Sequence, residues 1–129
     1  CAVASKVIDI YVRERIFDHA ALVGAYLQSQ LAKFAEHPLV GEVAGFGMIG
    51  ALELVADKAS KKPFDGMKVG QFCAKAAEEN GLVIRPLGGN RVAVCPPLII
   101  KEEHVDELVE KMGAALNMTL EWVAAEGLV

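Results

Sequence analysis

The chain has 129 residues, of which 53% are hydrophobic and 23% charged, and its formal net charge is −4. This length and composition exclude a disordered chain and fit one globular domain of ordinary size. The acidic balance argues against a nucleic-acid-binding protein and against attachment to an anionic membrane surface. No apolar run reaches the roughly 18 residues that a transmembrane helix needs.

The cysteines and the first residue bear on where the protein works. Its three cysteines, Cys1, Cys73 and Cys95, are odd in number and widely spaced. This pattern argues against a disulfide-stapled secreted domain and predicts a cytoplasmic protein. The chain begins at Cys1 instead of methionine, already inside a helical pattern, which predicts a piece of a longer protein.

Two helices are expected first in the chain. Apolar residues at helical spacing predict one helix over Ala2–Ile16. A second is expected to begin at Asp18, whose carboxylate can cap the first turn, and to end at His37-Pro38. Phe17 and Leu22 are spaced for a hydrophobic staple across that beginning. The apolar face of this second helix is expected to comprise Leu22, Tyr26, Leu27, Leu31 and Phe34.

Two more helices are expected in the second half. One is expected to be capped by Asp65 and to end at Asn80-Gly81, with the glycine as a left-handed stop. Its buried face is predicted from the helical spacing of Val69, Phe72, Cys73 and Ala76. The last helix is predicted over Glu102–Ala125, although Lys101 before it is a poor cap.

Short β-prone runs separate these helices, and they predict a small sheet. The expected strands are Glu42–Phe46, Met48–Val55, Leu82–Arg85 and Arg91–Cys95. The glycine-rich link between the last two indicates a hairpin, and Pro96-Pro97 ends the final strand. The order α-α-β-β-α-β-β-α predicts an α+β fold, a small and mostly antiparallel sheet with helices packed on one face.

The segment Gly45–Gly50 matches the pattern G-x-G-x-x-G of dinucleotide-binding proteins, with Asp65 where such a fold keeps its ribose-binding acid. The context argues against that interpretation, because the preceding strand is very short and Asp65 does not end a buried strand. We expect these glycines to allow a kink and close backbone packing instead. Binding of NAD is kept as a minor hypothesis.

Other reactive side chains show no catalytic or metal-binding pattern. His19, His37 and His104 lack the spacing of metal ligands, and the first and last of them are expected to be solvated. Cys95 has no histidine placed to activate it, so it is expected to be a small buried hydrophobe.

Arg85 is the outlier of the third strand, because it interrupts the apolar run Leu82–Ile84. Strand alternation places it on the same face as Val83. An arginine in a strand expected to be largely buried needs a partner, and its planar fork suits a carboxylate. The residues alone leave three interpretations open: an internal salt bridge, an edge position in water, or a clamp for a ligand carboxylate.

Three segments, in order and correctly spaced, carry a family resemblance. Val43–Val55 reads VAGFGMIGALELV, Gly81–Pro86 reads GLVIRP, and Val94–Ile100 reads VCPPLII. They resemble the segments RGxGLMxGxELV, GLIxRP and APPLII of class III pyridoxal-phosphate aminotransferases. Cys1–Ile10 also resembles the helix that follows SGHP in that family. Within the class the chain is most similar to the ω-aminotransferases, which include amine:pyruvate and β-alanine:pyruvate enzymes.

The resemblance implies the C-terminal small domain of a fold-type I homodimer that transfers amino groups between amines or amino acids and 2-oxo acids. Residues 1–37 would be a helical connection from a large domain, and residues 38–129 an α/β small domain. The family's Schiff-base lysine and most contacts to pyridoxal 5'-phosphate lie in the large domain. Lys33, Lys75 and Lys111 match no family motif. No catalytic, cofactor-binding or metal-binding residue is therefore assigned within this chain.

The resemblance assigns one substrate-binding residue, Arg85. In similar ω-aminotransferases the arginine of this strand swings toward the substrate carboxylate and moves aside for an apolar amine. Two departures stand out: Ala44 replaces the usual family arginine, and the turn Gly88–Asn90 is slightly long, which would offset Arg85. The alternative to an enzyme segment is a free-standing, non-catalytic interaction or regulatory domain derived from such an enzyme.

Overall fold

The computed structural model describes residues 1–128, and Val129, the last residue of the expected small domain, lies outside the described residues. The helices are α1 (Ala2–Arg13), α2 (Ile16–Ala32), the 3-10 helix η1 (Lys33–Glu36), α3 (Lys68–Glu79) and α4 (Glu102–Ala125). The strands are β1 (Val40–Phe46), β2 (Ile49–Asp57), β3 (Lys62–Pro63), β4 (Arg85–Leu87) and β5 (Arg91–Val94).

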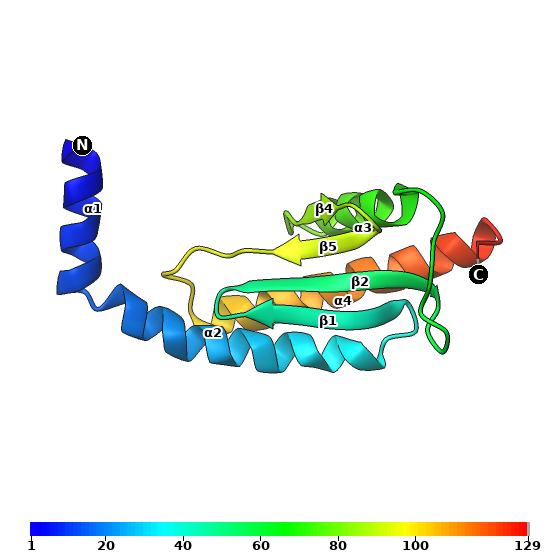
Figure 1. The fold of residues 1–129 in the computed structure, drawn as a ribbon, viewed down its shortest axis with the longest axis horizontal. Helices are drawn as coiled ribbons and strands as arrows, with labels where there is room; N and C mark the ends of the chain where they lie inside the picture. The colour runs from blue at the N-terminus through cyan, green and yellow to red at the C-terminus, as the bar shows by residue number, and fades with distance from the viewer. Residues whose placement is uncertain (129) are drawn as a thin grey trace.

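The sheet is antiparallel throughout and has the strand order β1-β2-β5-β4, with the short β3 pairing with the end of β2. Helices α2, α3 and α4 cover one face, and the other face is open toward the viewer in Figure 1. The predicted α+β architecture, with helices on one face of a small antiparallel sheet, is confirmed.

A single apolar core lies between the sheet and these helices. Alternate residues of β2, such as Leu52 and Leu54, point into it, as strand geometry requires. Helix α2 contributes Leu27 and Leu31, so it belongs to the folded body. The fully buried large side chains are Leu27, Leu31, Leu39, Val40, Leu52, Leu54, Val69, Val92, Val105, Met112, Leu116 and Val123.

The start of α2 differs from the prediction. The helix begins at Ile16, and Arg15 before it has a left-handed backbone (φ 52°) that breaks the continuity with α1. Asp18 lies in the first turn and accepts a hydrogen bond from Arg15 Nε at 2.8 Å instead of capping. Phe17 packs edge-on against Tyr11, and Leu22 is 75% exposed, so the predicted staple does not form. Leu22 is apolar but lies on the exposed side of α2. The buried side of the helix is formed by Ala20, Val23 and Leu27.

Helix α1 projects away from the rest of the molecule (Figure 1). None of its residues is buried, although the helical spacing of Val3, Val7, Ile10 and Tyr11 gives it an apolar side. A helix of this length gains little stability from its own hydrogen bonds, and an apolar side is usually stabilised by packing.

The ends of the other helices are partly as expected. Gly81 has φ +76° and provides the left-handed stop after α3. Asp65 does not cap α3, since Met67 is the residue before the helix and makes no capping hydrogen bond with its side chain. Helix α4 has the predicted bounds. Its cap comes from His104, whose Nδ1 accepts the Lys101 backbone N–H at 3.3 Å.

The predicted third strand is displaced along the chain. Leu82–Ile84 is irregular, and β4 consists of Arg85, Pro86 and Leu87. Pro86 can lie within β4 because β4 is at the edge of the sheet, where a proline is tolerated since its missing N–H faces away from the ladder. Arg85 therefore lies in a strand at the sheet edge, and the expectation of a largely buried strand is wrong.

The glycine pattern Gly45–Gly50 forms the tight hairpin between β1 and β2. Phe46 pairs with Ile49, and Gly47 adopts φ +56° in the turn. No helix follows the motif, so the strand-to-helix context that a dinucleotide site requires does not exist there. The expectation of close backbone packing is confirmed, since a Cβ on Gly24 of α2 would come within 2.9 Å of the Gly47 backbone.

We expect Gly45→Ala to lower the free energy of unfolding by about 1–3 kcal/mol. An added Cβ would lie 2.5 Å from the Ile49 carbonyl oxygen and 2.5 Å from Gln28 Oε1, so the hairpin would have to shift. Urea unfolding measures the effect. The control is Gly88→Ala, where no atom lies within 4 Å of the new methyl group. Equal stability of the two variants would show that close packing at Gly45 is unimportant.

Candidate functional site

The open face of the sheet is organised in rows that run across the strands. One row is formed by Ala44, Ala51, Ala93 and Arg85, each paired with the next across β1, β2, β5 and β4. The neighbouring row is formed by Glu42, Glu53, Arg91 and Leu87. Directly opposite residues of a sheet point to the same side. The open face therefore combines a floor of small side chains with a charged strip.

Arg85 lies in a shallow groove of about 620 Å³ at the β4 edge of this face. The groove is lined by Ile49, Val83, Ile84, Arg85, Pro86, Leu87, Ala93 and Cys95, and Arg85 is the charged residue among them. Val83 is 87% exposed, Ile84 is buried and Arg85 is exposed, so burial alternates along this segment although Leu82–Ile84 is not the predicted strand. The groove thus presents one guanidinium among uncharged side chains.

The Arg85 side chain makes no hydrogen bond and no ion pair with any other residue in 1–128. Its nearest row neighbour is Ala93, whose methyl group offers no polar partner. Of the three interpretations that the sequence left open, the internal salt bridge is therefore wrong. An exposed edge position and a ligand clamp are both compatible with this geometry.

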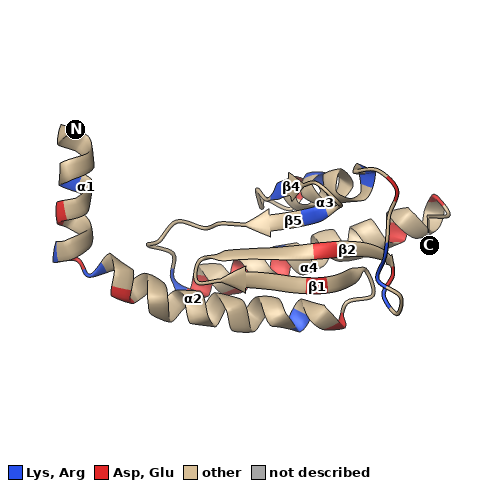
Figure 2. Ribbon diagram, viewed as in Figure 1, with Lys and Arg blue, Asp and Glu red and all other residues tan. Residues whose placement is uncertain are grey.

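The charged strip beside the groove contains the ion pairs of the open face. Arg91 Nη2 and Glu53 Oε1 are 2.8 Å apart, and Lys61 Nζ lies 3.9 Å from Glu42 Oε2. Figure 2 shows the acidic positions of β1 and β2 and the basic position of β5 side by side. A hollow of about 180 Å³ lies here, over Ala44 and Ala51 between the charged side chains. Ala44, where the resembled family has arginine, thus leaves space beside two carboxylates.

Asn90 anchors the hairpin that carries Arg85, a role that the sequence did not reveal. It is fully buried and has φ +56°. Its Oδ1 accepts the Gly70 N–H at 3.0 Å, and its Nδ2 donates to the Gly66 carbonyl at 2.7 Å. Its own carbonyl accepts the Leu54 N–H at 3.1 Å. The available signal was the pair Gly-Asn, because asparagine tolerates the left-handed region.

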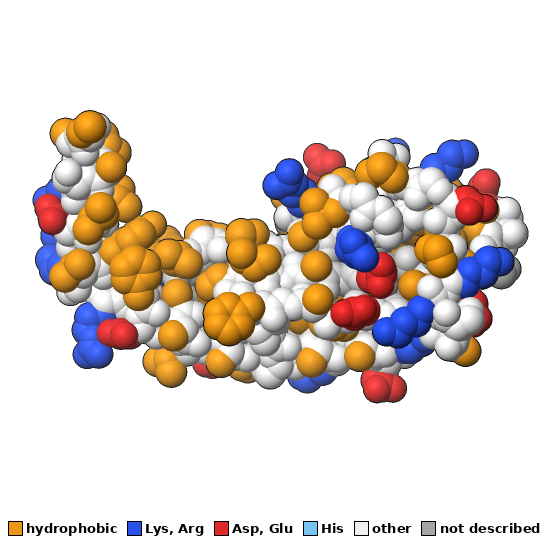
Figure 3. Space-filling model, viewed as in Figure 1, with side chains coloured by type: hydrophobic (Ala, Val, Ile, Leu, Met, Phe, Trp, Pro, Cys, Tyr) orange, Lys and Arg blue, Asp and Glu red, His pale blue; other side chains and the backbone are white. Residues whose placement is uncertain are grey.

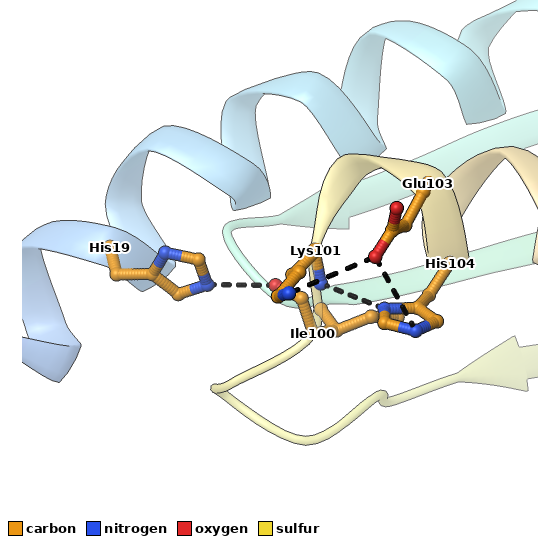
Figure 4. A network of polar contacts seen from close by, with 5 residues as sticks. All are labelled: His19, Ile100, Lys101, Glu103 and His104. Carbon is orange, nitrogen blue, oxygen red and sulfur yellow. Dashed lines mark hydrogen bonds and ion pairs between the residues drawn. The ribbon is translucent and has the colours of Figure 1, made fainter.

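Two histidines hold the segment that leads from β5 into α4 (Figure 4). His19 of α2 is half-buried and has its Nε2 2.8 Å from the Ile100 carbonyl oxygen, so the expectation that it is solvated is wrong. His104 is exposed and accepts the Lys101 N–H, with Glu103 4.0 Å from its Nε2. The His19 contact ties the segment before α4 to α2, and the His104 contact caps α4; the two rings do not converge on one point in Figure 4.

A second hollow, of about 340 Å³, lies on the other side of this segment between Gly81–Val83, Pro96-Pro97 and the first turns of α4. Lys111 and Glu107 border it, and a hydrogen bond of 2.5 Å from Lys111 Nζ lowers the pKa of Glu107. Both charges are therefore engaged with one another.

The remaining candidate side chains lie apart from the groove or lack partners there. Cys95 is exposed at the groove margin, so the expectation of burial is wrong for it, whereas Cys73 is buried and burial raises the pKa of its thiol. Within residues 1–128 no three His, Cys, Asp or Glu side chains cluster as metal ligands. The helices within residues 1–128 include none with the length and apolar character of a membrane-spanning helix.

Comparison with known proteins decides the family. The family model of class III aminotransferases matches residues 1–116. The chain belongs to the class III aminotransferase family. It is 39% identical to the diaminobutyrate–2-oxoglutarate transaminase of Halomonas elongata, over all of this chain and 28% of that protein. It is 38% identical to the putrescine–pyruvate aminotransferase of Pseudomonas aeruginosa, over 96% of this chain and 27% of that protein.

Solved transaminases share the fold of this aminotransferase chain. The ω-transaminase of Pseudomonas jessenii in complex with PMP superposes with a TM-score of 0.84 and 43% identity, over 90% of this chain and 26% of that one. A transaminase with L-alanine superposes with a TM-score of 0.89 and 35% identity, over 95% of this chain and 29% of that one. The chain thus spans less than a third of the length of the relatives it matches.

Proposed function

We propose that this chain is part of a pyridoxal-phosphate-dependent ω-aminotransferase and that it presents Arg85 to the carboxylate of a substrate. The observation that carries the proposal is the unpaired Arg85 guanidinium in a groove of uncharged side chains. A forked cation donates two parallel hydrogen bonds to a carboxylate, and low competition from neighbouring charges strengthens them. This chain would form one wall of the active site and so help to close it.

The relatives support the substrate class. Two of them are named for diaminobutyrate with 2-oxoglutarate and for putrescine with pyruvate. We infer that the full-length enzyme takes an amine or amino acid as donor and a 2-oxo acid such as pyruvate as acceptor. The donor can lack a carboxylate, as putrescine does. Arg85 would therefore bind the carboxylate of one substrate and move aside when the other substrate has none. A cytoplasmic homodimer, and a division of this chain at residue 38, stay predictions.

The described residues do not fit pyridoxal phosphate itself. The groove offers no lysine amine to carry the cofactor aldehyde. Lys75 and Lys111 pair with Glu79 and Glu107 on their own helices, and Lys33 donates to Gln30. The cofactor, which supplies the electron-withdrawing ring for amino transfer, would therefore be held by the rest of the protein. This chain's contribution is to bind and orient the substrate.

The apolar surface of the chain supports its being one part of a larger enzyme. Figure 3 shows hydrophobic side chains over α1, α2 and the β1–β2 hairpin, with charges gathered farther along the sheet. On the hairpin, Phe46 is 90% exposed and pairs with the exposed Ile49. Exposed apolar patches of this kind mark interfaces. We infer that the remainder of the enzyme packs here, on the side that Arg85 faces.

The full-length protein tests the proposal directly. We expect it to show the visible absorbance of bound pyridoxal phosphate, which borohydride should bleach and an amine donor should change. Pyruvate should then restore it. A full-length protein that stays colourless with added pyridoxal phosphate would contradict the proposal and favour the alternative, a non-catalytic interaction domain.

A further inference from the structure

We propose that Arg91 is a positioning residue for Arg85: by holding the Glu53 carboxylate, it prevents Glu53 from capturing the Arg85 guanidinium. This inference rests on the role proposed for Arg85. Its basis is the arrangement of four charged side chains on one face of the sheet. Arg91 lies directly between Glu53 on β2 and Leu87 on β4, and Arg85 is two residues from Leu87 on the same side.

Glu53 is within reach of Arg85 across the open face. They are separated by two strand spacings and two residues along the strand, which places their Cα atoms about 12 Å apart. An extended arginine and an extended glutamate that reach toward one another close a gap of that size. The path between them crosses β5 between Arg91 and Ala93, and on the side away from Arg91 it is bordered only by the methyl groups of Ala51 and Ala93.

Glu53 needs a cation, and Arg91 supplies it at 2.8 Å. Glu53 is also directly opposite Glu42, and like charges in that position repel one another. Lys61 lies beside Glu42, at 3.9 Å, and is not within 4 Å of Glu53. If Arg91 lost its charge, Arg85 in the neighbouring row would be a cation within reach of Glu53 that no carboxylate of residues 1–128 already holds. An Arg85 paired with Glu53 would then be lost to the substrate.

Ala44 makes the arrangement specific to this chain. It leaves the hollow of about 180 Å³ over the charged strip, so no side chain at this position supplies a second cation to Glu42 and Glu53. Arg91 is thus the one direct counter-ion of Glu53 within residues 1–128. The consequence is that substrate discrimination depends on a residue outside the groove.

The test uses the full-length holoenzyme and two amine donors, one with a carboxylate and one without. We expect Arg91→Gln to raise KM for the carboxylate-bearing donor about fivefold, the size expected of one partly exposed ion pair. KM for the simple amine should not change. Arg91→Lys should behave as the unsubstituted enzyme, and Glu53→Gln in the Arg91→Gln background should restore KM.

A matched variant separates capture from a general loss of positive charge. Glu42→Gln in the Arg91→Gln background restores the same net charge but leaves Glu53 free, so KM should stay raised. Restoration by Glu42→Gln as well as by Glu53→Gln would overturn the inference, and so would an unchanged KM in Arg91→Gln. An Arg85→Ala enzyme that treats both donors alike would refute the proposed role of Arg85, whatever Arg91 does.

Discussion

Arg85→Ala is expected to lower kcat/KM for a carboxylate-bearing amine donor about 100-fold in the full-length enzyme. Truncation of one partner of a hydrogen-bonded charge pair costs roughly 2–5 kcal/mol, and 100-fold corresponds to about 2.7 kcal/mol. The groove offers no other cation to take over the substrate carboxylate. A donor without a carboxylate should be turned over at an unchanged or slightly higher rate.

The measurement must isolate one half of the reaction, because the 2-oxo acid acceptor also carries a carboxylate. Single-turnover reactions of the cofactor-loaded enzyme with each donor, followed by absorbance, meet this need. Arg85→Lys is the conservative control. Lysine keeps the positive charge but lacks the planar fork of arginine. We therefore expect the rate with the carboxylate-bearing donor to fall less than in Arg85→Ala. Equal losses on both donors would mean that Arg85 acts on folding or on interdomain packing.

Periodicity predicted most of the secondary structure, because burial here is one-sided. Val69, Cys73 and Ala76 face the core from α3 as their spacing indicates, and α4 has the predicted bounds. The period of hydrophobic residues reports which side of an element is buried, and this signal is strong when one face of a sheet is covered. The same reasoning placed Arg85 on the face of Val83.

Local features outside that signal were missed. Arg15 takes a left-handed conformation that no apolar pattern marks, so the start of α2 was misplaced. The bounds of β4 depended on its being at the edge of the sheet, which is a property of strand order and not of local sequence. His19 contacts the Ile100 carbonyl, which is 81 residues away in the sequence. The spacing of residues within one helix cannot indicate such a contact.

The candidate site was accessible from the sequence only in part. A single arginine in an apolar strand drew attention to Arg85, and the family resemblance supplied its expected partner. Neither source revealed the row of alanines or the Arg91–Glu53 pair, because cross-strand neighbours are set by register. The role of Asn90 likewise depends on four segments that meet only in the folded chain.

Asn90→Ala is expected to lower the free energy of unfolding by about 3 kcal/mol. The substitution leaves the buried Gly70 N–H without its partner and removes the part-buried bond to the Gly66 carbonyl, and a buried group left unpaired costs about 1–3 kcal/mol. Alanine also tolerates φ +56° less well than asparagine. Urea unfolding of the full-length protein measures the loss. Hydrogen exchange should show the faster opening at Leu54 and Gly70, whose amides bond to Asn90.

Thr119→Val is the matched control, since Thr119 is the other buried polar residue within 1–128. Its hydroxyl donates to the Ala115 carbonyl of the same helix at 2.6 Å and also bonds to the buried Cys73 thiol of α3, a weak hydrogen-bonding group, so its loss does not touch the β4–β5 hairpin. We expect Thr119→Val to change the free energy of unfolding by less than about 1 kcal/mol. If Asn90→Ala were as mild as Thr119→Val, the β4–β5 hairpin would be held by strand pairing alone. The position of Arg85 would then follow from β5 and not from the turn.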